Sequence, residues 1–148
     1  MEQYSEMGDL AGIMAAMGIS WVVIAIIIFV SLWKIFQKAG RPGWEGIIPL
    51  YNYYILLVEV VGRPAWWIAF PIAAIVLGWV PIIGWLISIA FLVVHIIVSN
   101  DLSKAFGKGV GFTIGLVILG FIFFPILAFG NAQYLGKPNH LNSGVSEV

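Results

Sequence analysis

The 148-residue chain contains no cysteine and very little charge. The absence of cysteine excludes disulfides, thiolate metal sites and thiol catalysis. Charged residues make up 9% of the chain, whereas soluble domains carry roughly 25%. Seven basic residues balance seven acidic ones, so no overall electrostatic attraction draws the chain toward nucleic acid.

The sequence also lacks a catalytic or metal-binding pattern. Its two histidines, His95 and His140, belong to different expected elements, and no cluster has metal-ligand spacing. The glycine-rich stretch at 106–111 has neither the Lys-Ser/Thr pair nor the preceding strand of a phosphate-binding loop. We therefore expect a non-enzymatic protein without a cofactor or metal.

Apolar residues are what the chain has in abundance. They make up 61% of it, and the mean hydropathy is +1.04. A soluble domain of this size cannot bury so much apolar surface, so we expect an all-α integral membrane protein. The acidic N-terminus is unlike the basic start of a signal peptide, and we interpret the first apolar segment as a retained anchor.

Length and turn residues divide the chain into segments. The apolar block at 65–100 would form a helix of roughly 54 Å, too long for one crossing of a ~30 Å hydrocarbon core, and Pro81 and Gly84 divide it. The four predicted spans of this single membrane domain are about 10–36, 65–79, 82–100 and 112–129, followed by a flexible tail at about 135–148.

The segment at 47–62 is nearly long enough to cross but carries Asn52 and Glu59. If it does not cross, six of the seven Lys and Arg residues share one side; if it crosses, they divide four to three. Basic loops stay cytoplasmic, so we expect an interfacial or re-entrant helix here and four transmembrane helices elsewhere, with both termini outside. The sequences GRPGW at 40–44 and GRPAW at 62–66 bracket this segment.

Ionisable and polar residues inside apolar segments are candidate functional residues. They are Glu59, Ser88, His95, Ser99 and Asp101. The two serines and the histidine share one helical face, which lines a polar path or, as we favour, hydrogen-bonds neighbouring helices.

Each of the two acidic candidates also has a structural interpretation. Glu59 is a proton or cation site, or pairs with Arg63 four residues later, and we favour the pair. We expect Asp101 to be a solvated loop charge. Gly111 and Gly115 have the spacing that lets helices pack closely.

Two loops, KAGRPGWEGIIPLYN at 38–52 and DLSKAFGKGVGF at 101–112, carry a resemblance. They resemble an uncharacterised bacterial family of small multi-pass membrane proteins, which is sometimes labelled signal peptidase I-like. The resemblance spans about residues 33–134 and implies a bacterial cytoplasmic (inner) membrane. It implies no activity, because the outward-facing catalytic domain of signal peptidase is missing from this chain.

Two functional hypotheses follow from the sequence. The first is an accessory or scaffold subunit that contacts lipids and packs against a larger membrane protein or against itself as a homo-oligomer. The second is a small oligomeric transporter or channel, because broken helices and re-entrant segments are where transport sites occur. In the second hypothesis, Glu59, His95 and Asp101 lie near the transport path.

Overall fold

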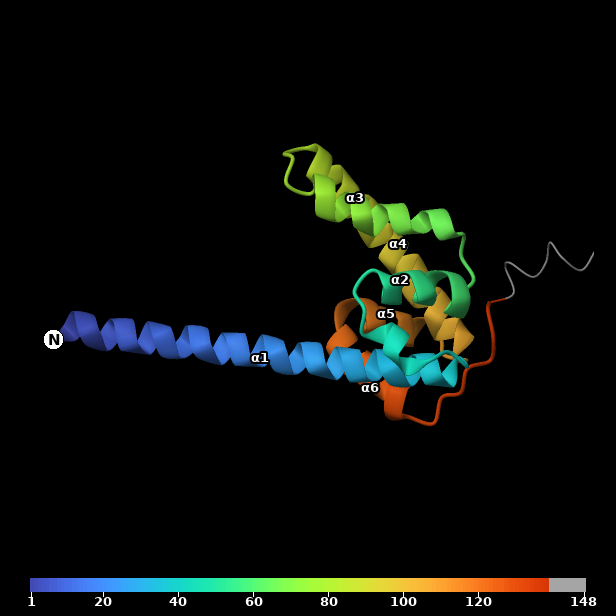
Figure 1. The fold of residues 1–148 in the computed structure, drawn as a ribbon, viewed down its shortest axis with the longest axis horizontal. Helices are drawn as coiled ribbons and strands as arrows, with labels where there is room; N and C mark the ends of the chain where they lie inside the picture. Colours follow the sequence, from blue (N-terminus) through green and yellow to red (C-terminus); the bar gives the residue numbers. More distant parts are fainter. Residues whose placement is uncertain (139–148) are drawn as a thin grey trace, which may run out of the picture.

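The computed structural model describes residues 1–138, and every regular element in that range is helical. The elements are α1 (Glu2–Lys38), η1 (Gly43–Gly46), α2 (Tyr51–Ile55), η2 (Leu56–Val60), η3 (Ala65–Ile68), α3 (Ala69–Leu77), α4 (Ile83–Ala105), α5 (Val110–Ile118) and α6 (Gly120–Phe129). Figure 1 shows two arms that project from a compact part.

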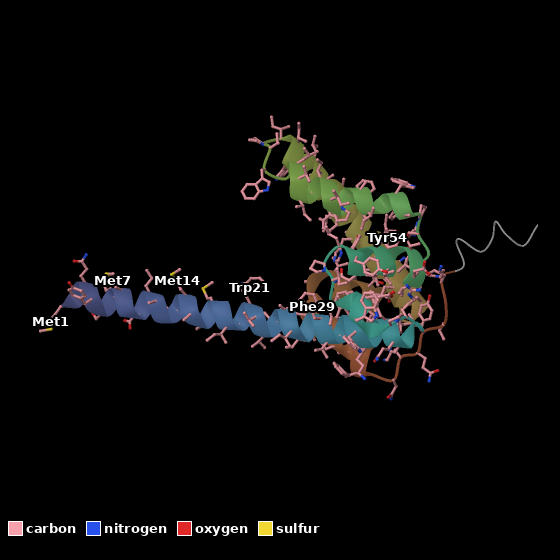
Figure 2. The ribbon with its side chains drawn as sticks, viewed as in Figure 1. Met1, Met7, Met14, Trp21, Phe29 and Tyr54 are labelled. Carbon is pink, nitrogen blue, oxygen red and sulfur yellow. The ribbon has the colours of Figure 1, made fainter. Side chains whose placement is uncertain are left out.

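The first arm is α1, a helix of 37 residues that is roughly 55 Å long at ~1.5 Å per residue. Its C-terminal end packs against α6 and η1 in the compact part. The remainder extends away from the rest of the chain, and Met7, Met14 and Trp21 point outward with no other element beside them (Figure 2). Every residue at 3–23 is exposed.

The second arm is an antiparallel hairpin of α3 and the first half of α4 (Figure 1). The two helices approach closely at the tip, where a Cβ added to Gly84 would lie 2.5 Å from the Gly78 carbonyl oxygen. Pro81 and Ile82 form the turn, as the sequence predicts. Helix α4 continues to Ala105, five residues beyond the predicted end of that span.

Two helices, α1 and α4, are long and apolar enough to cross a membrane. Shorter apolar helices lie at 65–77 and 120–129, and α5 has nine residues. The all-helical fold is therefore confirmed. The sequence predicts four spans, but only two helices in the described residues are long enough to cross a membrane.

The segment at 47–62 lies at the centre of the compact part. Helix α2 and the π-helical turn η2 together cover ten residues, too few to cross a bilayer. Their apolar side chains form much of the core, with Leu57, Val60 and Val61 fully buried. The segment at 47–62 is apolar on nearly all sides because it is buried between other helices.

The predicted span at 112–129 is wrong in form. The structure has two helices of nine and ten residues, α5 and α6, separated at Leu119, whose φ of −122° and ψ of 45° are not helical. Pro125 lies inside α6, so the main bend is six residues earlier than this proline. The two helices fold back on each other (Figure 1).

The chain beyond α6 returns along the compact part. Within the predicted flexible tail, the Leu135 amide donates a hydrogen bond to the Ala105 carbonyl at 2.7 Å, and Pro138 is buried. The tail is therefore packed up to residue 138. The rest of the predicted tail, including His140, lies outside the described residues.

Candidate functional site: the polar end

Polar side chains gather where α1 and α4 both end. We call this region the polar end and define it by the side chains that hold it together: Lys38, Arg41, Arg63, Asp101, Lys108 and Tyr134. It lies on the opposite side of the compact part from the free end of α1 (Figure 1).

An ion pair between Arg63 and Asp101 joins the second arm to the core. Arg63 Nε donates to Asp101 Oδ2 at 2.6 Å, and the Asp101 side chain is 2% exposed. The Arg63 guanidinium also lies 4.8 Å from the Trp67 ring centroid, in a cation–π contact. Asp101 is thus buried within α4, and the prediction of a solvated loop charge is wrong.

The predicted pair between Glu59 and Arg63 is also wrong. Four-residue spacing brings side chains together on a regular α-helix, but η2 is π-helical and Gly62 follows with a φ of 81°. This bend directs Arg63 toward α4. Glu59 instead lies near Arg41 and Tyr134. The hydrogen bond to Glu45 raises the pKa of Arg41 and the charge of Glu59 adds to this effect, while burial raises the pKa of Tyr134 and the charge of Glu59 again adds to it.

A second ion pair joins Arg41 to Glu45. Two hydrogen bonds of 2.9 and 2.7 Å link the guanidinium to the carboxylate, and the Glu45 side chain is 5% exposed. The hydrogen bond from Arg41 to Glu45 is the largest contribution that raises the pKa of Arg41, and the charge of Glu59 acts in the same direction. Bidentate geometry makes this pair stronger than a single contact.

The two GRP sequences form a repeat in three dimensions. Gly40 and Gly62 both have left-handed φ values, 76° and 81°, which glycine adopts without the clash of a Cβ. The prolines that follow, Pro42 and Pro64, each directly precede a four-residue 3-10 helix. Each repeat therefore bends the chain sharply and presents an arginine to a buried carboxylate.

Lys38 closes the end of α6, a role that the sequence does not reveal. Its Nζ donates to the carbonyl oxygens of Leu127, Gly130 and Ala132 at 2.7, 2.9 and 2.9 Å. Carbonyls at a helix C-terminus lack partners within the helix, and a lysine satisfies them. Burial lowers the pKa of Lys38, and nearby Lys108 lowers it further.

Tyr134 anchors the returning chain. Its hydroxyl donates to the Val60 carbonyl at 2.6 Å, and its ring lies 5.6 Å from that of Phe106. Val60 is the last residue of η2, and carbonyls at a helix C-terminus lack partners within the helix, so this carbonyl is free to accept from Tyr134. In the sequence, only the presence of an aromatic residue, Tyr134, in the polar segment after α6 could have indicated that this segment is anchored.

The predicted polar stripe shares one face of the continuous helix α4, but its members differ in exposure. Ser88 is exposed and donates to the Gly84 carbonyl in its own helix at 2.7 Å. Ser99 is buried. His95 is half-buried, with its ring 6.3 Å from that of Phe91.

Phe91 also contacts Tyr53 of α2, with ring centroids 6.2 Å apart. The Tyr53 hydroxyl is buried and has no hydrogen-bond partner among the described residues. Burial raises the pKa of Tyr53 to about 12. A buried hydroxyl of this kind marks either strain or a place for a bound polar group.

Of the two predicted packing glycines, only Gly115 faces a neighbouring helix. A Cβ at Gly115 would lie 2.3 Å from Phe123 Cε1 of α6, whereas nothing lies within 4 Å of a Cβ at Gly111. Close packing therefore occurs within the α5–α6 pair at one glycine.

The side chains of the polar end hold the helices in place, and its exposed cations can contact anions. The described residues contain no group of three or more side chains that could hold a metal ion. Lys34, Lys104 and Lys108 are exposed, and so are Trp44, Tyr51 and Trp66. Cations beside amphipathic aromatic rings are typical of a lipid headgroup region.

Residues 44–137 match a family described as a family of unknown function (DUF5684). The match begins after α1 and covers the rest of the compact part and the second arm. No curated protein and no solved structure matches the chain.

Proposed function

The chain belongs to this family, DUF5684, and we propose that it is a non-enzymatic accessory or scaffold subunit of a complex in the bacterial cytoplasmic membrane. The observation that carries the proposal is the exposure of α1. This helix is long and apolar enough to cross a membrane, and it is exposed throughout residues 3–23. Such an apolar surface requires lipid or another protein to cover it.

One face of α1 is suited to a partner helix. Small residues recur every four positions at Gly8, Gly12, Ala16 and Ser20. A groove of about 310 Å³ lies beside the last two and is also lined by Met17 and Trp21. Lipid chains cover any apolar shape, whereas small residues in a row let a second helix approach closely.

The structural use of charge supports a non-enzymatic role. Arg63 and Arg41 neutralise the buried carboxylates of Asp101 and Glu45. Lys38 directs its three hydrogen bonds to backbone carbonyls. These contacts stabilise the junction between helices.

The distribution of basic residues supports an orientation. Contacts of Lys38, Arg63 and Lys137 place them at the polar end, while the free end of α1 carries Glu6 and Asp9. Since basic segments remain cytoplasmic, the polar end faces the cytoplasm and its exposed lysines contact anionic lipid phosphates. The start of α1 is on the outer side.

A transporter or channel is the second candidate, and Tyr53 is the observation that favours it. Its buried, unpartnered hydroxyl lies beside Phe91, which in turn contacts His95. In a homo-oligomer this group would border a polar path. The combined change of His95→Ala and Glu59→Gln would then abolish ion or proton flux while assembly stays intact.

The accessory-subunit proposal is tested by adding bulk to the small face of α1. We expect Gly12→Ile with Ala16→Ile to release the partner from a complex purified with its own lipids. Met7→Phe with Met14→Phe adds bulk to the opposite side of α1, away from the groove, and should leave the complex intact. Both pairs of changes lie where α1 touches no other element, so the fold is preserved. A complex that survives the Gly12 and Ala16 changes would contradict the proposal.

A further inference from the structure

The α5–α6 pair forms a tight hairpin. The rings of Phe112 and Phe123 lie 5.1 Å apart at an angle of 74°. On a straight helix, residues eleven positions apart would be separated by roughly 16 Å along the axis. The bend at Leu119 keeps backbone hydrogen bonds, since its amide donates to Gly115 and its carbonyl accepts from Ile122.

Both ends of this hairpin meet at the polar end. Helix α5 begins two residues after Lys108, whose charge acts on Lys38. Helix α6 ends at carbonyls that Lys38 binds. The following chain bonds to Ala105 through Leu135. The chain therefore leaves and re-enters the same end of the molecule.

The hairpin is apolar on its outside and too short to cross. Nine or ten residues extend roughly 13–15 Å, about half of a ~30 Å hydrocarbon core. Ile114 and Ile118 are 54% and 70% exposed, and Phe121, Ile122 and Ile126 are also exposed. These side chains need lipid or a partner protein to cover them. The backbone N–H and C=O groups of Leu119 at the bend are hydrogen-bonded within the hairpin, which a lipid environment requires.

The α3–α4 hairpin, by contrast, is long enough to cross. Arg63 meets Asp101 at the base, and Gly78 meets Gly84 at the tip. From Gly84 to Asp101, α4 rises by seventeen residue steps, roughly 26 Å, which is close to the hydrocarbon thickness of ~30 Å. The segment formed by η3 and α3 runs between the same base and tip contacts. Exposed Trp79 and Trp85 mark the tip, where aromatic side chains anchor at the far interface.

We propose that α5–α6 is a re-entrant hairpin and that the chain crosses the bilayer three times, through α1, through η3 joined to α3 (65–77), and through α4. The start of α1 then lies on one side, and residues 130–138 lie on the other. All seven Lys and Arg residues fall on the side of the polar end, whereas the expected four crossings leave Lys137 opposite the other six. This inference rests on the membrane location proposed above but does not depend on any partner.

The test uses the natural absence of cysteine to place single cysteines in sealed vesicles of known orientation. Gln3→Cys marks the start of α1, Lys104→Cys marks the polar end, and Gln133→Cys marks the chain after α6; all three positions are exposed. Ile118→Cys marks the bend of the hairpin. A charged, membrane-impermeant maleimide is added to one side at a time.

We expect Lys104→Cys and Gln133→Cys to react from the same side, and Gln3→Cys from the opposite side. Ile118→Cys should react only with a lipid-soluble maleimide. Reaction of Gln133→Cys from the side of Gln3→Cys would overturn the hairpin and restore four crossings. Extraction of the wild-type protein from the vesicles by alkaline carbonate would instead overturn the membrane location itself.

Discussion

Arg63 and Asp101 lie 38 residues apart in the chain and form an ion pair of 2.6 Å at the base of the second arm. The carboxylate belongs to α4 and the guanidinium to the bend that precedes η3. Because the pair holds the start of the α3 arm against α4, it fixes where that hairpin meets the compact part.

We expect Arg63→Gln to lower the free energy of unfolding by about 3 kcal/mol, because it removes the cation beside a buried carboxylate. Thermal unfolding in detergent measures the change. Asp101→Asn in the same chain should recover part of the loss, as coupled residues do in a double-mutant cycle. Lys104→Gln, at an exposed position, should stay within about 0.5 kcal/mol of the wild type. Equal effects of Arg63→Gln and Lys104→Gln would refute the role of the pair.

Gly115 and Gly111 provide a matched test of the α5–α6 hairpin. A Cβ at Gly115 would overlap Phe123, and overpacking costs about 1–3 kcal/mol. We expect Gly115→Ala to destabilise the protein by about 1–2 kcal/mol. Gly111→Ala meets open space and should stabilise α5 by up to about 1 kcal/mol. If both changes act alike in thermal unfolding, the two helices do not fold back as described.

Tyr53 predicts a stability change at alkaline pH. Its pKa rises from 10.0 to about 12 on burial, so the folded state holds the phenolic proton more tightly than the unfolded state. The contribution of this group to stability is complete below pH 10 and is lost as the pH rises toward about 12. Tyr53→Phe should remove this alkaline loss, which chemical denaturation at several pH values measures.

The same Tyr53→Phe change should raise the free energy of unfolding near neutral pH by about 1 kcal/mol, because it removes a buried hydroxyl without a described partner. Tyr54→Phe, on the neighbouring half-buried side chain, is the control. A large loss of stability with Tyr53→Phe would indicate that the hydroxyl has a partner, as the transporter hypothesis requires.

Two proline-led turns store backbone strain. Leu50 and Ile82 have positive φ values of 63° and 69°, and the amide after each donates to the proline carbonyl before it, at 2.7 and 2.8 Å. These are γ-turns of the strained form. Ile82 is 78% exposed, so Ile82→Gly removes strain with little loss of packing and should stabilise by about 1 kcal/mol. Ile82→Ala keeps the Cβ and should not stabilise the protein. Equal melting temperatures for the two variants would contradict the presence of backbone strain at Ile82.

Local sequence signals predicted part of this fold well. Apolar length predicted α1 and α4, and Pro81 with Gly84 predicted the turn between α3 and α4. The sequences GRPGW and GRPAW form two bends of similar form, with matching left-handed φ values at Gly40 and Gly62. In each case the determining interactions lie within a few residues of the chain.

The contacts that set the polar end are not local. Asp101 is adjacent to a glycine-rich loop in sequence, and only the bend at Gly62 brings Arg63 to it. The α5–α6 bend lacks a proline, while Pro125, the stronger local signal, is accommodated inside α6. Lys38 binds carbonyls about ninety residues away, and nothing in its neighbourhood predicts that contact.

The native mass of the protein, extracted together with its own lipids under mild conditions, is the most direct test of the accessory-subunit proposal. We expect a mass that includes a second, larger membrane protein and that falls to the lone chain with Gly12→Ile and Ala16→Ile. A closed homo-oligomer without a partner, whose ion flux is lost with His95→Ala and Glu59→Gln, would contradict it and identify a transporter or channel.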